Sequence, residues 1–256
     1  MQSLLSRGVT ADVRPTQAPA APRSTPATDR RPGGAGLPTV DDAALSRMTR
    51  RVTFAVGLAA MAYAVLRYVV AGDVAPAQLP LFVANKAIAF TGAALLAACL
   101  ALTPLMSRVP RLGAWGGLRK NFGLVGFGLS AIHVLMTMVL MNPAYYAKLY
   151  DAGGRMTIQG ELALLTGILA FAALVLPAMT SVQVIRQSIG LEKWLSIQKL
   201  AVLALALTGL HLVALGLPTW LAPASWPAGL PPITLAALLV VVATFITRRA
   251  LARRPT

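Results

Sequence analysis

Residues 121–141 read NFGLVGFGLSAIHVLMTMVLM, an apolar run with no charged side chain. At about 1.5 Å per residue, a helix of this length crosses the roughly 30 Å hydrocarbon core of a bilayer. Five further runs have a similar length and composition, at about 52–71, 86–106, 160–180, 198–217 and 231–247. The sequence therefore predicts an all-α membrane protein, a bundle of six transmembrane helices.

The composition of the 256 residues excludes an ordinary soluble domain. Hydrophobic residues make up 57% and charged residues 12%, whereas soluble domains are about 45–50% apolar and about 25% charged. The charged residues inside the predicted helices lie toward the helix ends, where long side chains can reach the interface. They are Arg67, Lys86, Glu161 and Lys199.

The first 44 residues differ from the rest of the chain. They are rich in Pro, Ala, Thr and Arg, show no apolar periodicity and contain no signal-peptide core. Such a segment cannot bury enough surface to offset the entropy of ordering. We expect residues 1–44 to form a disordered cytoplasmic tail, followed by one transmembrane domain over residues 45–256.

The basic residues predict the topology. The tail, the second and fourth connections and the C-terminus hold 19 of the 23 lysines and arginines. The positive-inside rule then places both termini of this multi-pass protein in the cytoplasm. The net charge of +15 is explained by this topology, so we expect the lipid bilayer and no nucleic acid as a partner.

Two histidines, His133 and His211, are the only imidazoles in the chain. Each follows the cytoplasmic start of its helix (Asn121 or Lys199) by 12 residues, about 18 Å of helix, so both side chains are expected at one depth. Two imidazoles at one level can ligate a haem iron from both faces, whereas a zinc site usually needs three or four ligands. The alternative is that each histidine is a packed residue hydrogen-bonded to a neighbouring helix.

Several short segments occur in a familiar order over about 110 residues. They are Leu102-Thr103-Pro104-Leu105, Leu118-Arg119-Lys120-Asn121-Phe122-Gly123-Leu124, Thr180-Ser181 and Gly190-x-x-x-Trp194, with His133 and His211 completing the pattern. With these segments the chain resembles the ferric-reductase-like transmembrane family. Within that family it is most similar to the haem-binding membrane subunit of the methionine sulfoxide reductase system, the MsrQ type.

The resemblance implies a function in electron transport at a bacterial inner (plasma) membrane. A b-type haem would receive electrons from a cytosolic flavin reductase or quinol, with FMN as a candidate second cofactor. It would pass them to a periplasmic or extracellular acceptor, such as the catalytic subunit of a methionine sulfoxide reductase or a ferric chelate. The chain has no NAD(P)H or FAD domain, so we expect an electron-transfer subunit of an oxidoreductase. A self-contained NAD(P)H oxidoreductase is not expected.

One departure from the family pattern limits the number of haems. The family usually shows Leu-His-Arg-Leu at the position where this chain reads Ile197-Gln198-Lys199-Leu200. Members with two haems use paired histidines about 13 residues apart on both helices. The inner partners here would be Gln198 and either Arg119 or Lys120, none of which is an ordinary haem ligand. The resemblance therefore implies a single haem, in the outer half.

Two pairs of basic residues have a functional and a structural interpretation. Arg119 and Lys120 could contact a flavin phosphate or a flavoprotein, or simply anchor the topology. Arg67 and Lys86 could pair with haem propionates, or simply reach the interface.

Two other features carry no catalytic prediction. Gly123, Gly126 and Gly128 do not form a nucleotide-binding loop and more plausibly allow close helix approach. The sequence contains no Ser-His-Asp, paired-carboxylate or CxxC arrangement, and no catalytic residue is predicted. The alternative function is that of a haem-free membrane protein, a small transporter or an assembly factor, which kept the architecture.

Overall fold

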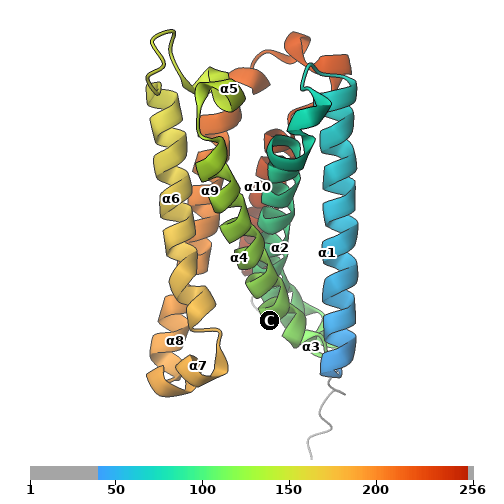
Figure 1. Ribbon diagram of the computed structural model, residues 1–256. Helices are drawn as coiled ribbons and strands as arrows, with labels where there is room; N and C mark the ends of the chain where they lie inside the picture. The colour runs from blue at the N-terminus through green and yellow to red at the C-terminus, as the bar shows by residue number, and fades with distance from the viewer. Residues whose placement is uncertain (1–39, 253–256) are drawn as a thin grey trace, which may run out of the picture. The chain divides into compact units, whose positions relative to one another are not determined.

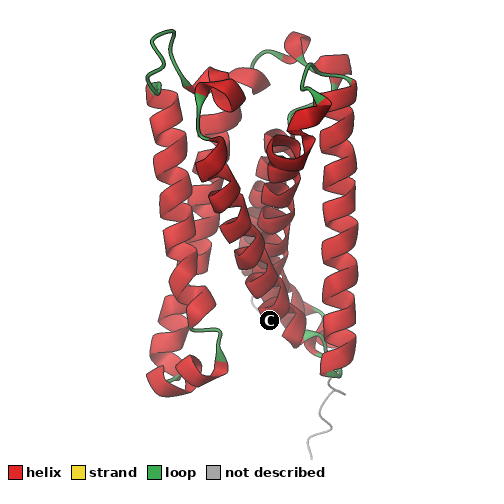
Figure 2. Ribbon diagram, in the orientation of Figure 1, coloured by secondary structure: helices red, strands yellow, loops and turns green. Residues whose placement is uncertain are grey.

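The computed structural model describes residues 40–252, and the long helices in this range confirm the predicted six-helix membrane bundle (Figure 1). No strand occurs among the described residues (Figure 2). The segments long and apolar enough to cross a membrane are Asp42–Val70, Pro76–Arg108, Gly116–Leu140, Ile158–Met179, Leu191–Trp220 and Pro227–Leu251.

Shorter elements extend or connect the long helices. The long helices are α1 (Asp42–Val65), α2 (Ala84–Arg108), α4 (Gly116–Leu140), α6 (Ile158–Met179), α9 (Leu200–Trp220) and α10 (Ile233–Ala252). The short α-helices are α3 (Pro110–Gly113), α5 (Pro143–Tyr146), α7 (Gln183–Ile189) and α8 (Leu191–Gln198). The π-helical and 3₁₀ segments are η1 (Leu66–Val70), η2 (Pro76–Gln78), η3 (Leu79–Val83), η4 (Ala147–Leu149), η5 (Pro223–Ser225) and η6 (Pro227–Gly229).

The first helix begins before its apolar run. The run was expected to start at about residue 52, but α1 starts at Asp42, because the carboxylate of Asp41 caps it by accepting a hydrogen bond from the Ala44 backbone N–H. A cap and not the bilayer surface therefore sets this boundary. Residues 42–44 of the predicted tail are helical, and residues 1–39 lie outside the described range.

The two histidine-bearing helices have different packing partners. Helix α4 packs along α2, while α9 packs along α6 and α10 (Figure 1). Within the described range, α4 and α9 do not pack along each other. The contact of α4 with α2 is close at Gly126, where an added Cβ would lie 2.8 Å from Leu96 Cγ. The expected role of small residues thus holds at Gly126, whereas Gly128 faces open space.

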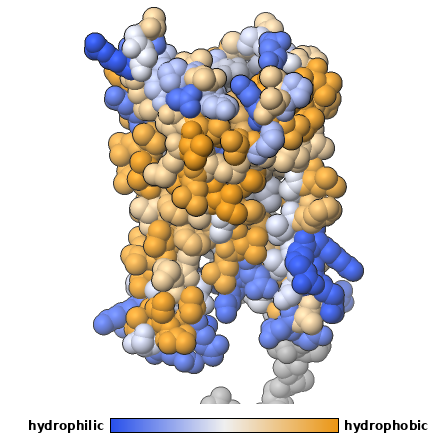
Figure 3. Space-filling view, in the orientation of Figure 1, coloured by the Kyte–Doolittle hydropathy of each residue, from blue (hydrophilic) through white to orange (hydrophobic). Residues whose placement is uncertain are grey.

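The two ends of the bundle differ in charge. The basic end holds the start of α1, the start of α4, the ends of α2 and α10, and the short helices α7 and α8. Its basic residues include Arg47, Arg50, Arg51, Arg108, Arg111, Arg119, Lys120, Arg186, Lys193, Lys199, Arg248 and Arg249. The opposite end holds α5, η4 and the connection from α9 to α10. An apolar belt lies between the two polar ends (Figure 3), as expected of a multi-pass membrane protein.

Candidate functional site

The imidazole of His133, on α4, is hydrogen-bonded to the neighbouring helix α2. Its Nδ1 lies 2.8 Å from Oδ1 of Asn85 and 3.4 Å from Oγ1 of Thr137, one turn further along α4. The closer partner is an amide oxygen, which can only accept a hydrogen bond. His133 therefore carries its proton on Nδ1 and keeps the lone pair of Nε2.

The imidazole of His211, on α9, is hydrogen-bonded to α6. Its Nδ1 lies 2.7 Å from the backbone oxygen of Ala163. Its ring packs against Gly167, where an added Cβ would lie 2.9 Å from Nδ1. A backbone carbonyl also only accepts, so His211 has the same tautomer as His133. In metal-ligating histidines the second ring nitrogen typically donates to an oxygen in this way, so both side chains fit axial ligation of a haem.

Both histidines lie in the half of the bundle away from the basic end, nearer α5 and η4. Asn85 is in the first turn of α2, and Ala163 is in the second turn of α6. The described residues contain no group of three or more His, Cys, Asp or Glu side chains that could hold a metal ion. Of the metal sites, a haem needs only the two imidazoles.

Arg67 is buried at the same end of the bundle as the histidines. Its exposed fraction is 5%, and its Nε donates to the backbone oxygen of Pro231 over 2.9 Å. Its guanidinium carbon lies 4.9 Å from the ring centroid of Tyr68. No acidic side chain in residues 40–252 pairs with it, so its positive charge is held without a carboxylate.

Lys86 follows Asn85 directly and lies among aromatic rings. Its Nζ is 4.3 Å from the centroid of Phe82, 4.9 Å from that of Tyr68 and 5.8 Å from that of Tyr146. Tyr68 thus contacts both Lys86 and Arg67, so the structure brings this predicted pair together. Cation–π contacts stabilise the ammonium but leave its charge uncompensated.

Lys148, on η4, is a third cation in this group and was not predicted as a site residue. The charges of Arg67 and Lys148 both act on Lys86. Burial lowers the pKa of Lys148 below its usual value, and the charge of Arg67 lowers it further. Its Nζ donates over 3.0 Å to the backbone oxygen of Leu215, one turn beyond His211. Arg67, Lys86 and Lys148 are called the outer cation cluster below.

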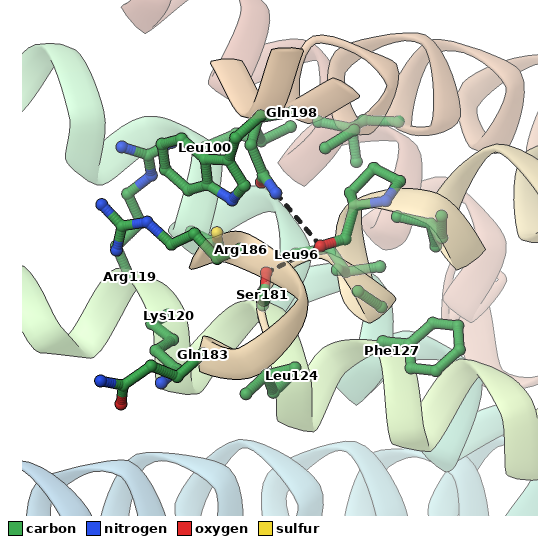
Figure 4. A pocket seen from close by; sticks show the side chains of 18 of the residues that line it. Leu96, Leu100, Arg119, Lys120, Leu124, Phe127, Ser181, Gln183, Arg186 and Gln198 are labelled. Atoms are coloured by element: carbon green, nitrogen blue, oxygen red, sulfur yellow. Dashed lines mark hydrogen bonds between the residues drawn. The ribbon is translucent and has the colours of Figure 1, made fainter. Parts of the chain in front are cut away.

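A cavity of about 500 Å³ opens at the basic end, between α2, α4, α6, α7, α8 and α9. Arg119 and Lys120 line it, as does Arg186, whose guanidinium carbon lies 4.5 Å from the centroid of Trp194. Figure 4 shows these cations on one side of the cavity and Phe127 on the other. No carboxylate of residues 40–252 lines it, so the cavity combines apolar walls with a positively charged mouth.

The sequence grouped Arg119 and Lys120 but did not indicate Arg186 or Trp194 as site residues, although Trp194 ends the Gly190-x-x-x-Trp194 segment. Both residues belong to the fourth connection, which forms α7 and α8. Gly190 separates these two short helices with a φ of 75°, a conformation that favours glycine.

An aromatic pair separates the cavity from the histidines. Phe127, which lines the cavity, stacks on Phe171 of α6 with centroids 5.6 Å apart and planes 2° from parallel. Phe171 lies one helical turn from Gly167, which touches His211. Neither histidine lines the cavity. The molecule therefore has two candidate sites at different depths.

Gln198 lines the cavity and is tied to the end of α6. Its Nε2 donates to the backbone oxygen of Pro177 over 3.1 Å and to Oγ1 of Thr180 over 3.3 Å. Ser181 Oγ also donates to Pro177 O, over 2.7 Å (Figure 4). The amide of Gln198 thus connects α8 with α6.

Comparison with known proteins finds one similar family over part of the chain. A family model described as the ferric reductase like transmembrane component matches residues 87–209. The matched segment contains His133 and ends two residues before His211. No curated protein matches the chain. Residues 87–209, just under half of the chain, are therefore similar to the transmembrane component of ferric reductases.

Proposed function

We propose that the protein is a transmembrane b-type cytochrome that holds one haem between His133 and His211. The observation that carries this proposal is that the two imidazoles have the same tautomer, with the proton on Nδ1. Each Nδ1 lies within 2.8 Å of a carbonyl oxygen, of Asn85 or of Ala163, and each Nε2 keeps its lone pair. Helices α4 and α9 do not pack along each other in the described range, which is compatible with a flat group between them.

The side chains nearer the basic end support one haem and not two. Gln198 is engaged with α6 through its amide, and Arg119 and Lys120 have no lone pair to offer an iron when charged. No imidazole remains for a second site, because the chain contains two histidines.

The bound haem would supply one-electron chemistry at its iron. Two propionates add negative charge, which is costly to bury without a counter-charge. The outer cation cluster offers three basic side chains with no acidic partner among residues 40–252. Arg67 and Lys86 are proposed to pair with the propionates, and Lys148 adds to their field.

Electrons are proposed to enter at the basic end and leave at the opposite end. The positive-inside rule puts the basic end in the cytoplasm of a bacterial inner membrane. The cavity there, with Arg119, Lys120 and Arg186 at its mouth, suits the phosphate of a flavin such as FMN, the surface of a flavin reductase, or a quinol. The acceptor is proposed to be the catalytic subunit of a methionine sulfoxide reductase, as for the MsrQ type, or a ferric chelate.

The test is the haem content of the purified protein. A pyridine haemochrome assay is expected to give about one haem b per polypeptide with a low-spin bis-histidine spectrum. Gln198→Ala serves as a matched control, since it changes a cavity residue but should leave the spectrum unchanged. A ratio near two would overturn the single site, and a ratio near zero after haem supplementation would favour the haem-free alternative.

A further inference from the structure

Asn85 is the most deeply buried polar side chain near the histidines. It lies in the first turn of α2 with an exposed fraction of 1%. A buried amide is costly unless it is hydrogen-bonded, and this one has three partners. Its Oδ1 is 2.8 Å from Nδ1 of His133, and its Nδ2 donates to Oγ1 of Thr137 over 2.9 Å and to Oη of Tyr146 over 3.4 Å.

The structure orients the amide of Asn85. Its NH₂ group donates to the hydroxyl oxygens of Thr137 and Tyr146, and its Oδ1 is turned toward His133. If the amide were reversed, the NH₂ group would donate to Nδ1 of His133. The imidazole proton would then sit on Nε2, and that nitrogen could not bind a metal. The orientation of Asn85 therefore selects the tautomer of His133 that can act as a ligand.

The two histidines differ in how their tautomers are set. His211 donates to the backbone oxygen of Ala163, an acceptor that no side-chain substitution removes. His133 depends on the side chain of a residue 48 positions away on another helix. One axial ligand is therefore supported by the backbone and the other by Asn85.

We propose that Asn85 is a positioning residue for the haem, which holds His133 as the ligating tautomer and sets its strength as an electron donor to the iron. This inference rests on the proposed function. A hydrogen bond from Nδ1–H to an oxygen raises the basicity of a ligating imidazole and stabilises the ferric state. The reduction potential of the haem consequently depends on the acceptor at position 85.

The test compares two substitutions with opposite expected effects. Asn85→Leu removes the acceptor, so the haem potential should become more positive and haem affinity should fall by about 10- to 100-fold. Asn85→Asp offers a carboxylate, a stronger acceptor, so the potential should become more negative while haem is retained. A residue that only fills space would not give shifts of opposite sign.

Potentiometric titration of the purified protein measures the shifts, and the EPR spectrum of the ferric form reports the orientation of the imidazole planes. Asn121→Leu is the matched control. Asn121 lies on α4, the helix of His133, but 12 residues before it. Its amide donates to Oγ1 of Thr49 over 3.3 Å. Its replacement should leave the potential and the EPR spectrum unchanged.

Each outcome decides one question. Suppose that the wild type binds haem but both Asn85 variants keep its potential, or shift it in the same direction. This result overturns the positioning role and leaves the proposed function standing. A wild type that binds no haem overturns the proposed function itself. Should Asn85→Leu not accumulate in the membrane, Asn85→Asp decides: a more negative potential supports the inference, and an unchanged one refutes it.

Discussion

Gly167 offers a direct way to disturb one histidine without removing it. The glycine lies on α6 against the ring of His211, and a Cβ added there would be 2.9 Å from Nδ1 and 3.0 Å from Cε1. Ordinary contact begins at 3.4 Å, so in Gly167→Ala the ring must move by about 0.5 Å. The ring has little freedom, because its Nδ1 is already 2.7 Å from the Ala163 oxygen.

A displacement of this size is large for a metal ligand. Metal–ligand distances are held to about 0.2 Å, and overpacking costs about 1–3 kcal/mol. If this cost falls on the bound state, haem affinity should decrease on the order of 5- to 150-fold. The helix itself should not suffer, because alanine favours an α-helix by about 1 kcal/mol over glycine.

Haem titration into apo-protein, followed by absorption, measures this loss. Gly167→Ala should bind more weakly and show partial conversion from low to high spin. Gly128→Ala is the matched control, since it adds the same methyl group to a membrane helix where no atom lies within 4 Å. If Gly167→Ala binds haem with wild-type affinity and spectrum, His211 does not hold the iron in the geometry described.

Three further predictions concern the ligands, the topology and the outer cation cluster. His133→Ala and His211→Ala should each abolish the low-spin spectrum, and the double variant should show the same spectrum as either single variant. The reason is that losing one axial ligand already breaks the six-coordinate iron. A normal spectrum in either single variant would contradict ligation of one iron by both histidines. Alkaline phosphatase fused after Thr256 should be inactive and fused after Pro223 active, and the reverse activities would exchange the two faces. Burial and the charge of Arg67 lower the pKa of Lys148, so its amine should lose its proton at a lower pH than an ordinary lysine. It should therefore react at that lower pH with a membrane-impermeant acylating reagent on intact cells. Peptide mapping across a pH series measures this, and an onset of reaction at the pH typical of free lysine would refute it.

The sequence predicted the six transmembrane helices because a long apolar segment in a membrane can adopt few structures. In lipid every backbone polar group must be satisfied within the segment, which leaves the helix. Boundaries were less predictable, because α1 begins at a cap well before its apolar run. The helices α7 and α8 in the fourth connection were not predicted, because they are too short to show an apolar period.

The sequence identified His133 and His211 as candidates because imidazoles are rare in membrane helices. It could not identify Asn85 or Ala163, each 48 residues from the histidine it contacts. A backbone carbonyl has no sequence signal, and a single asparagine at the start of a helix is unremarkable until the packing of α2 on α4 is known. Haem ligation by the pair stays a prediction.

The tie between Gln198 and α6 bears on how this chain could change in evolution. A histidine at position 198 would lack the amide that donates to Pro177 O and Thr180 Oγ1, so it would come with a weaker connection between α6 and α8. It would also face no partner imidazole, since α4 presents Arg119 at the cavity. Two substitutions would therefore have to arise together before a pair of imidazoles could form at the cavity.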